Sequence, residues 1–169
     1  KNILEVGSGF STAVMIDTVK SISNYKPKIK VIDIDHSRTN ALVSTNDAEI
    51  IQQRFQDTSI SDINFLNDGD LLFIDSSHVL KCGSDLHHLF FEIIPNLKQD
   101  LYMHFHDIAH PFHYAENQTE SGHFWNEAYA LRLFLSNNSK WKIHFWIDYA
   151  MKEFSDLIKS KLPLCCKNG

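Results

Sequence analysis

A glycine turn near the start of the chain, at residues 3–12, constrains the fold more than any other stretch. It reads Ile-Leu-Glu-Val-Gly-Ser-Gly-Phe-Ser-Thr, an apolar run that carries Glu5 and then turns through Gly7 and Gly9. Two glycines remove the Cβ atoms that would keep a small molecule away from the backbone, as in a strand–turn–helix unit that approaches a ligand. A carboxylate in an otherwise apolar strand costs free energy unless it has a use. The stretch therefore predicts a nucleotide-type cofactor site.

Short apolar runs alternate with segments of helical periodicity along the rest of the chain. The predicted strands after the turn are residues 29–34, 49–53 (a short edge strand), 71–74, 101–105 and 141–147. The predicted helices begin near Ser11, at Ser37, after Ser84 (with Pro95 following the helix), at residue 122 and at residue 151, and a loop is expected at residues 109–121. This alternation predicts a single α/β domain over residues 1–169, a doubly wound and mostly parallel sheet with helices on both faces.

Acidic residues stand at the ends of four of the predicted strands: Glu5, Asp33 with Asp35, Asp75 and Asp107. Ligands of open α/β sheets bind at the carboxyl ends of the strands. We therefore expect these carboxylates to meet at one edge of the sheet and to form the functional site there.

Composition excludes several other classes of function. The 16 basic and 21 acidic residues give a net charge of −5 without any basic block, which argues against binding to nucleic acids or to membrane surfaces. No stretch is apolar and long enough to span a bilayer. The three cysteines include an adjacent pair and form no disulfide framework, so a reducing, cytoplasmic location is expected.

The turn Glu5-Val6-Gly7-Ser8-Gly9 resembles motif I of the class I S-adenosylmethionine (SAM)-dependent methyltransferases. Thr12 stands where a nicotinamide dehydrogenase would have a third small residue, so a dinucleotide enzyme ranks last. Residues 70–78, 104–108 and 122–129 are similar to the fourth-strand end, the fifth-strand end and the following helix of a bacterial subgroup of small-molecule and sugar O-methyltransferase-like proteins. The resemblance implies the SAM methyltransferase fold, SAM as the cofactor and a small-molecule methyl acceptor.

The resemblance also implies roles for individual residues. Backbone and side-chain groups of the glycine turn would contact the methionine part of SAM, and an acid after the second strand would bind the ribose hydroxyls. Asp35 is preferred for the ribose because a helix is expected directly after it, and Asp33 is the alternative. The full set of predicted cofactor-binding residues is Glu5, Gly7, Ser8, Gly9, Asp35, Gln56, Asp57 and Asp75.

Four residues are candidates for the chemistry or for a metal ion. His78 is the candidate general base, because imidazole titrates near neutral pH, and His106 is the second catalytic candidate. Some related O-methyltransferases hold a divalent cation at the ends of the fourth and fifth strands, which implies Asp75, His106 and Asp107 as ligands of Mg²⁺ or Mn²⁺. Capping of the strand ends by these side chains is the alternative interpretation.

The chain starts inside a predicted strand, and Lys167–Gly169 stands where the last strand of such folds would begin, so both ends are expected to be trimmed. A second copy of the chain, or segments upstream of it, are the expected macromolecular partners. Two further hypotheses stay open: a non-catalytic, SAM-fold binding or regulatory module, and a metal-dependent enzyme that uses the His and Asp residues.

Overall fold

The computed structural model describes residues 1–44 and 46–166. The described residues form two compact units, which divide between His106 and Asp107. Whether the two units associate into the single domain predicted for residues 1–169 stays a prediction. The predicted start of a last strand at Lys167–Gly169 lies outside the described residues.

The first unit is built on a sheet of five parallel strands. They are β1 (Ile3–Val6), β2 (Ile29–Asp33), β3 (Glu49–Gln52), β4 (Leu71–Ile74) and β5 (Tyr102–Phe105). Their order across the sheet is β3-β2-β1-β4-β5, so the order reverses between β1 and β4. A reversal of this kind opens a crevice at the carboxyl ends of the two strands. The predicted α/β sheet is confirmed, with β3 at its edge.

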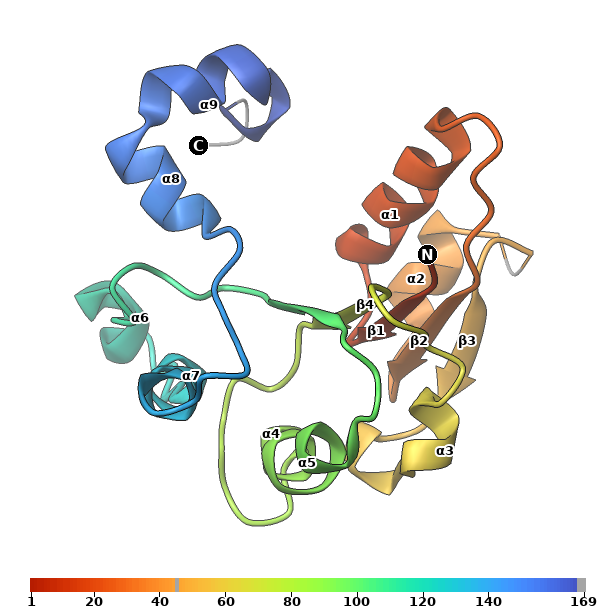
Figure 1. The fold of residues 1–169 in the computed structure, drawn as a ribbon, viewed down its shortest axis with the longest axis horizontal. Helices are drawn as coiled ribbons and strands as arrows, with labels where there is room; N and C mark the ends of the chain where they lie inside the picture. The colour runs from red at the N-terminus through yellow and green to blue at the C-terminus, as the bar shows by residue number, and fades with distance from the viewer. Residues whose placement is uncertain (45, 167–169) are drawn as a thin grey trace. The chain divides into compact units, whose positions relative to one another are not determined.

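Helices lie on both faces of this sheet (Figure 1). On one face, α1 (Phe10–Ser21) packs Ile16 against Ile3, Ile29 and Val31 of β1 and β2, and α2 (Ser37–Leu42) lies beside α1. The other face carries the connection from β4 to β5, which runs through α4 (Asp85–His88), a π-helical turn (Leu89–Ile93) and α5 (Ile94–Asn96). The short η1 (Phe55–Asp57) and α3 (Ile60–Ile63) connect β3 to β4.

Two predicted helix boundaries in the first unit are wrong. Gly9, not Ser11, is the N-cap of α1, because the Ser11 hydroxyl donates a hydrogen bond to Glu5 instead. Pro95 lies inside the continuous helical segment Asp85–Asn96 and not after it, and the π-helical turn Leu89–Ile93 directly precedes α5, in which it lies. The predicted cap at Ser84 is confirmed: its side chain accepts a hydrogen bond from the backbone N–H of His87.

The second unit is helical in its described residues, with α6 (Glu116–Glu120), α7 (Glu127–Ser136), α8 (Ile147–Glu153), α9 (Ser155–Lys161) and a 3₁₀ turn (Pro163–Cys166). The strand predicted at residues 141–147 is wrong, because residues 141–146 have no regular structure and α8 begins at Ile147. Within residues 107–166 no strand is present for this apolar run to pair with. The run is held by Trp146 instead, whose Nε1 donates to the carbonyl oxygen of Ile108 at 2.7 Å.

The helix predicted from residue 122 begins only at Glu127, and α6 lies within the predicted loop at residues 109–121. Across the described part of both units, every helix is too short or too polar to cross a lipid bilayer.

Candidate functional site

The glycine turn lies where β1 and β4 end side by side. The backbone N–H of Asp75 donates to the carbonyl oxygen of Val6 at 2.9 Å, and the N–H of Gly7 donates to Ile32 at 3.0 Å. Gly7 has φ of +85°, and a Cβ atom on it would lie 1.8 Å from the backbone oxygen of Asp75. The close approach of two strand ends therefore requires Gly7, in addition to any need for a ligand to reach the backbone.

Glu5 is fully buried beneath this turn and is bound by two hydroxyl groups of α1. Ser11 donates to Oε1 at 2.5 Å and Thr12 donates to Oε2 at 2.6 Å. Burial raises the pKa of Glu5 to about 7, although the two hydroxyl donors lower it and the charges of Asp75 and Asp33 add to the rise. Glu5 thus links β1 to the first turn of α1 and carries a proton below neutral pH.

Replacing Glu5 with glutamine is expected to remove a pH dependence of stability. The pKa of Glu5 is about 7 in the folded protein, whereas its ordinary value is 4.5. Between pH 4.5 and pH 7 the folded protein therefore keeps a proton on Glu5 that the unfolded chain has lost. The free energy of unfolding of the unmodified protein should therefore fall as the pH rises from 4.5 to 7, by up to about 3 kcal/mol. Urea unfolding should show that Glu5→Gln is more stable than the unmodified protein at pH 8 but not at pH 5.

The exposed Asp17 of α1 supplies the matched control, and Asp17→Asn should leave the difference between pH 5 and pH 8 unchanged. A Glu5→Gln variant that loses stability equally at both pH values would show instead that the ionised carboxylate is required.

A chain of hydrogen bonds connects the glycine turn to the end of β2. The Ser8 hydroxyl donates to Oδ2 of Asp33 at 2.6 Å and accepts from the Thr39 hydroxyl of α2 at 2.6 Å. Asp35 is exposed and accepts from the backbone N–H of Ser37 at 3.0 Å, and hydrogen bonds from Ser37 hold its pKa below the usual range. The structure therefore brings Asp33 to the turn and leaves Asp35 at the start of α2.

Gln56 and Asp57, predicted to reach the adenine, lie in the 3₁₀ turn after β3. Asp57 forms a two-point ion pair with the neighbouring Arg54, with both distances at 2.8 Å. The Gln56 amide donates to the carbonyl oxygen of Gly83 at 3.4 Å. Neither side chain contacts the glycine turn through a hydrogen bond in the described residues.

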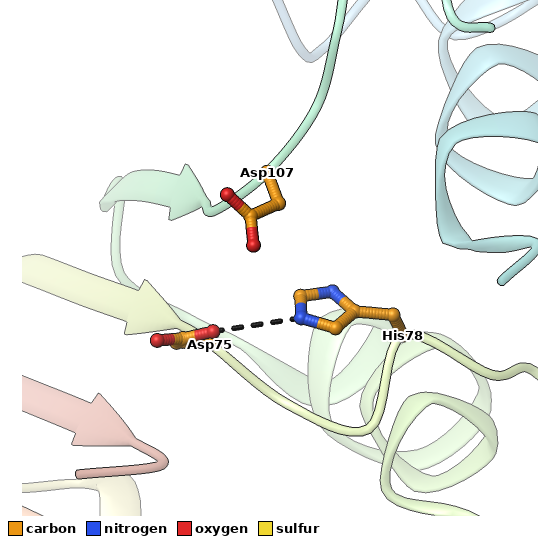
Figure 2. Close-up of side chains that lie close together, drawn as sticks. All are labelled: Asp75, His78 and Asp107. Atoms are coloured by element: carbon orange, nitrogen blue, oxygen red, sulfur yellow. Dashed lines mark ion pairs between the residues drawn. The ribbon is translucent and has the colours of Figure 1, made fainter. Parts of the chain in front are cut away.

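Asp75 and His78 form a pair at the end of β4. His78 is buried, has a φ of +58°, and places Nε2 3.6 Å from Oδ1 of Asp75 (Figure 2). The imidazoles of His78, then His106 and His104, lower the pKa of Asp75. Asp107 follows His106 directly after β5 and is the first residue of the second unit, so its predicted role as a metal ligand stays a prediction.

His106, the other predicted catalytic residue, is directed to a different neighbour. Its Nδ1 lies 3.3 Å from Nε2 of His104. Both rings line a cavity of about 490 Å³ in the first unit, together with Ser8 and Asp75. A cavity of this size is within the range that small-molecule sites occupy.

Sequence reasoning missed His104 and gave Asp33 second place. His104 stands two residues before His106, and on a strand this spacing puts both side chains on one face, so the period of two could have identified it. The contact of Asp33 with Ser8 joins residues 25 positions apart and depends on how β1 and β2 pair.

Comparison with known proteins agrees with this geometry. The family described as "Methyltransferase domain" matches residues 4–108, which is more than half of the chain and covers the five strands except for Ile3 of β1. No curated protein and no solved structure matches the chain. The match over residues 4–108 identifies the chain as a member of the methyltransferase-domain family, and the five-stranded parallel sheet with a glycine turn at its reversal point agrees with it.

Proposed function

We propose that the chain is a SAM-dependent O-methyltransferase that acts on a hydroxyl group of a small molecule. The observation that carries the proposal is the position of the Asp75–His78 pair, which follows β4 at the reversal point where β1 ends in the glycine turn. The glycine turn and the Asp75–His78 pair lie at one edge of the same sheet, which supports the proposal.

The residues at this edge fit a nucleoside-type cofactor. Asp33 is half-buried beside the turn, and its carboxylate would accept hydrogen bonds from the ribose hydroxyls. Two buried atoms nearby in the chain, Oγ of Ser76 after β4 and Nδ1 of His36 after β2, have no hydrogen-bond partner among the described residues. Unpaired buried polar atoms cost free energy that a bound polar molecule can recover.

Bound SAM supplies a methyl group on a positively charged sulfur. The chain itself has to align the acceptor oxygen with that group and remove the proton of the acceptor hydroxyl. His78 would take this proton on its imidazole ring, and Asp75, ionised because of the neighbouring imidazoles, would stabilise the imidazolium. The predicted divalent cation at Asp75, His106 and Asp107 is not needed for these steps and stays a prediction.

The test of the proposal is methyl transfer from methyl-labelled SAM to a panel of phenols and sugars. We expect S-adenosylhomocysteine to form only when a hydroxylated acceptor is present, with the label on oxygen in the product as located by mass spectrometry. Binding of SAM without any acceptor-dependent turnover would contradict the proposal and favour the non-catalytic binding module. Label on a nitrogen or a carboxylate would correct the acceptor class.

Asp33 and Asp35 give a matched pair of variants for cofactor binding. Asp33→Asn should weaken SAM binding at least tenfold by calorimetry, because the charged acceptor for two ribose hydroxyls is lost. Asp35→Asn should change the dissociation constant less than threefold, since this exposed side chain is hydrogen-bonded to Ser37 at the start of α2. A larger loss of SAM affinity in Asp35→Asn than in Asp33→Asn would assign the ribose contact to Asp35 instead.

A further inference from the structure

We propose that His104 and His106 form a two-point chelate for a borderline transition-metal ion such as Zn²⁺, on the sheet face that lines the 490 Å³ cavity. This site does not depend on the proposed methyl transfer, and it differs from the Asp75, His106 and Asp107 set that the sequence predicts.

Strand geometry brings the two rings together. β5 is held against β4 up to its end, since the backbone N–H of His106 donates to the carbonyl oxygen of Ile74 at 2.9 Å. Side chains two residues apart on such a strand project from the same face. His104 and His106 therefore meet without any rearrangement of the backbone.

The distance between the facing nitrogens suits a shared ion. Nε2 of His104 and Nδ1 of His106 are 3.3 Å apart. Zinc–nitrogen bonds of about 2.0–2.1 Å in tetrahedral geometry place two ligand nitrogens roughly 3.3–3.4 Å from each other. The ring centroids are 5.6 Å apart, so the two nitrogens now face each other nearly head-on. Binding of one metal ion would turn both rings towards it and replace the hydrogen bond that one imidazole now donates to the other.

The ring of His104 packs on the core, and the cavity beside the two rings is lined by Arg38 as well as by Asp75. His104 stacks on Phe73 of β4 with ring centroids 4.2 Å apart and an interplanar angle of 5°. Phe73 is 9% exposed and therefore fixed in the core. The carboxylate of Asp75 lines the same cavity and adds negative charge beside the two rings.

The donor set selects the class of metal. Imidazole nitrogens favour Zn²⁺, Ni²⁺ and Cu²⁺, whereas Mg²⁺ and Ca²⁺ take oxygen ligands. Two protein ligands leave coordination positions that face the cavity, where Ser8 also lies. Water or an oxygen atom of a small molecule could complete the coordination there.

The test is calorimetric titration of the full chain with Zn²⁺ alone, without SAM. We expect one Zn²⁺ per chain, and at least a tenfold weaker affinity in His104→Gln and in His106→Gln. His87→Gln is the matched control, because His87 also packs on a phenylalanine, Phe91, with ring centroids 5.1 Å apart. It differs from His104 in that the neighbouring histidine, His88, is the next residue of a helix and not two residues along a strand. The control should bind Zn²⁺ within twofold of the unmodified protein, and Mg²⁺ should give no comparable binding.

A second measurement needs no variant and so does not depend on how the variants fold. Nitrogen NMR of the histidine rings should show Zn²⁺-dependent shifts at Nε2 of His104 and Nδ1 of His106. The proposal is overturned if both variants bind Zn²⁺ like the control, or if the shifts fall on other histidines. A loss of binding in Asp75→Asn and His78→Gln, with His104→Gln unaffected, would overturn it as well and favour a site at the end of β4.

Discussion

Replacing Gly7 with alanine is expected to destabilise the protein by more than about 3 kcal/mol, in the range of the most damaging single substitutions. A Cβ atom at Gly7 would lie 1.8 Å from the backbone oxygen of Asp75, and this neighbour is backbone that cannot rotate away. The ends of β1 and β4 would have to separate, which would break the hydrogen bond from Asp75 to Val6. Urea unfolding followed by circular dichroism measures the loss.

Gly83 provides a control that separates the clash from the cost of backbone conformation. Its φ of +72° is close to the +85° of Gly7, but nothing lies within 4 Å of a Cβ placed on it. Gly83→Ala should therefore cost only about 1–2 kcal/mol, the usual penalty for a left-handed residue. Equal losses in the two variants would mean that the strand ends separate easily and that Gly7 is required for its conformation alone.

Replacing His78 with glutamine is expected to lower kcat by a factor of about 10²–10⁴, the usual contribution of general acid–base catalysis. Glutamine retains hydrogen-bonding groups but cannot take up a proton at neutral pH. The affinity for SAM should change less than threefold, because His78 follows β4 and lies outside the Ser8–Asp33–Thr39 chain of hydrogen bonds. Steady-state kinetics with the acceptor found in the transfer assay separates kcat from KM.

Chemical rescue distinguishes a base from a structural residue. In His78→Ala, added imidazole should restore part of kcat, since a small base can enter the space that the side chain leaves. His87→Gln should leave kcat unchanged, because His87 lies on α4 and packs on Phe91. A rise in KM with an unchanged kcat in His78→Gln would contradict the role of a base and assign His78 to acceptor binding.

The conformation of His78 also agrees with a functional role. Its φ of +58° is uncommon for a residue with a side chain. Such conformations cost about 1–3 kcal/mol and concentrate at active sites, where the surrounding structure maintains them. At this position the conformation accompanies a ring directed at Asp75 (Figure 2).

The strands of the first unit could be predicted because their pattern is local. Leu71–Ile74 is continuous and apolar, as expected of a parallel strand buried on both faces, and the structure gives it the same bounds. The Trp141–Ile147 segment is also rich in apolar residues, interrupted by Lys142 and His144, but it forms no strand. Strand formation depends on a neighbour to pair with and not on the segment alone. The same limit applies to Ser11, whose hydroxyl binds Glu5 six residues earlier instead of capping α1.

The sequence by itself determined the α/β class, the glycine turn and the set of acids at the strand ends, since these follow from period and residue type along a few neighbouring positions. Only the tertiary structure decided which of those groups meet. It turned Asp33 and not Asp35 towards Ser8, paired His78 with Asp75, and faced His104 with His106. The physical reason is that strand register and the positive φ of His78 set these distances, and both depend on contacts between distant parts of the chain.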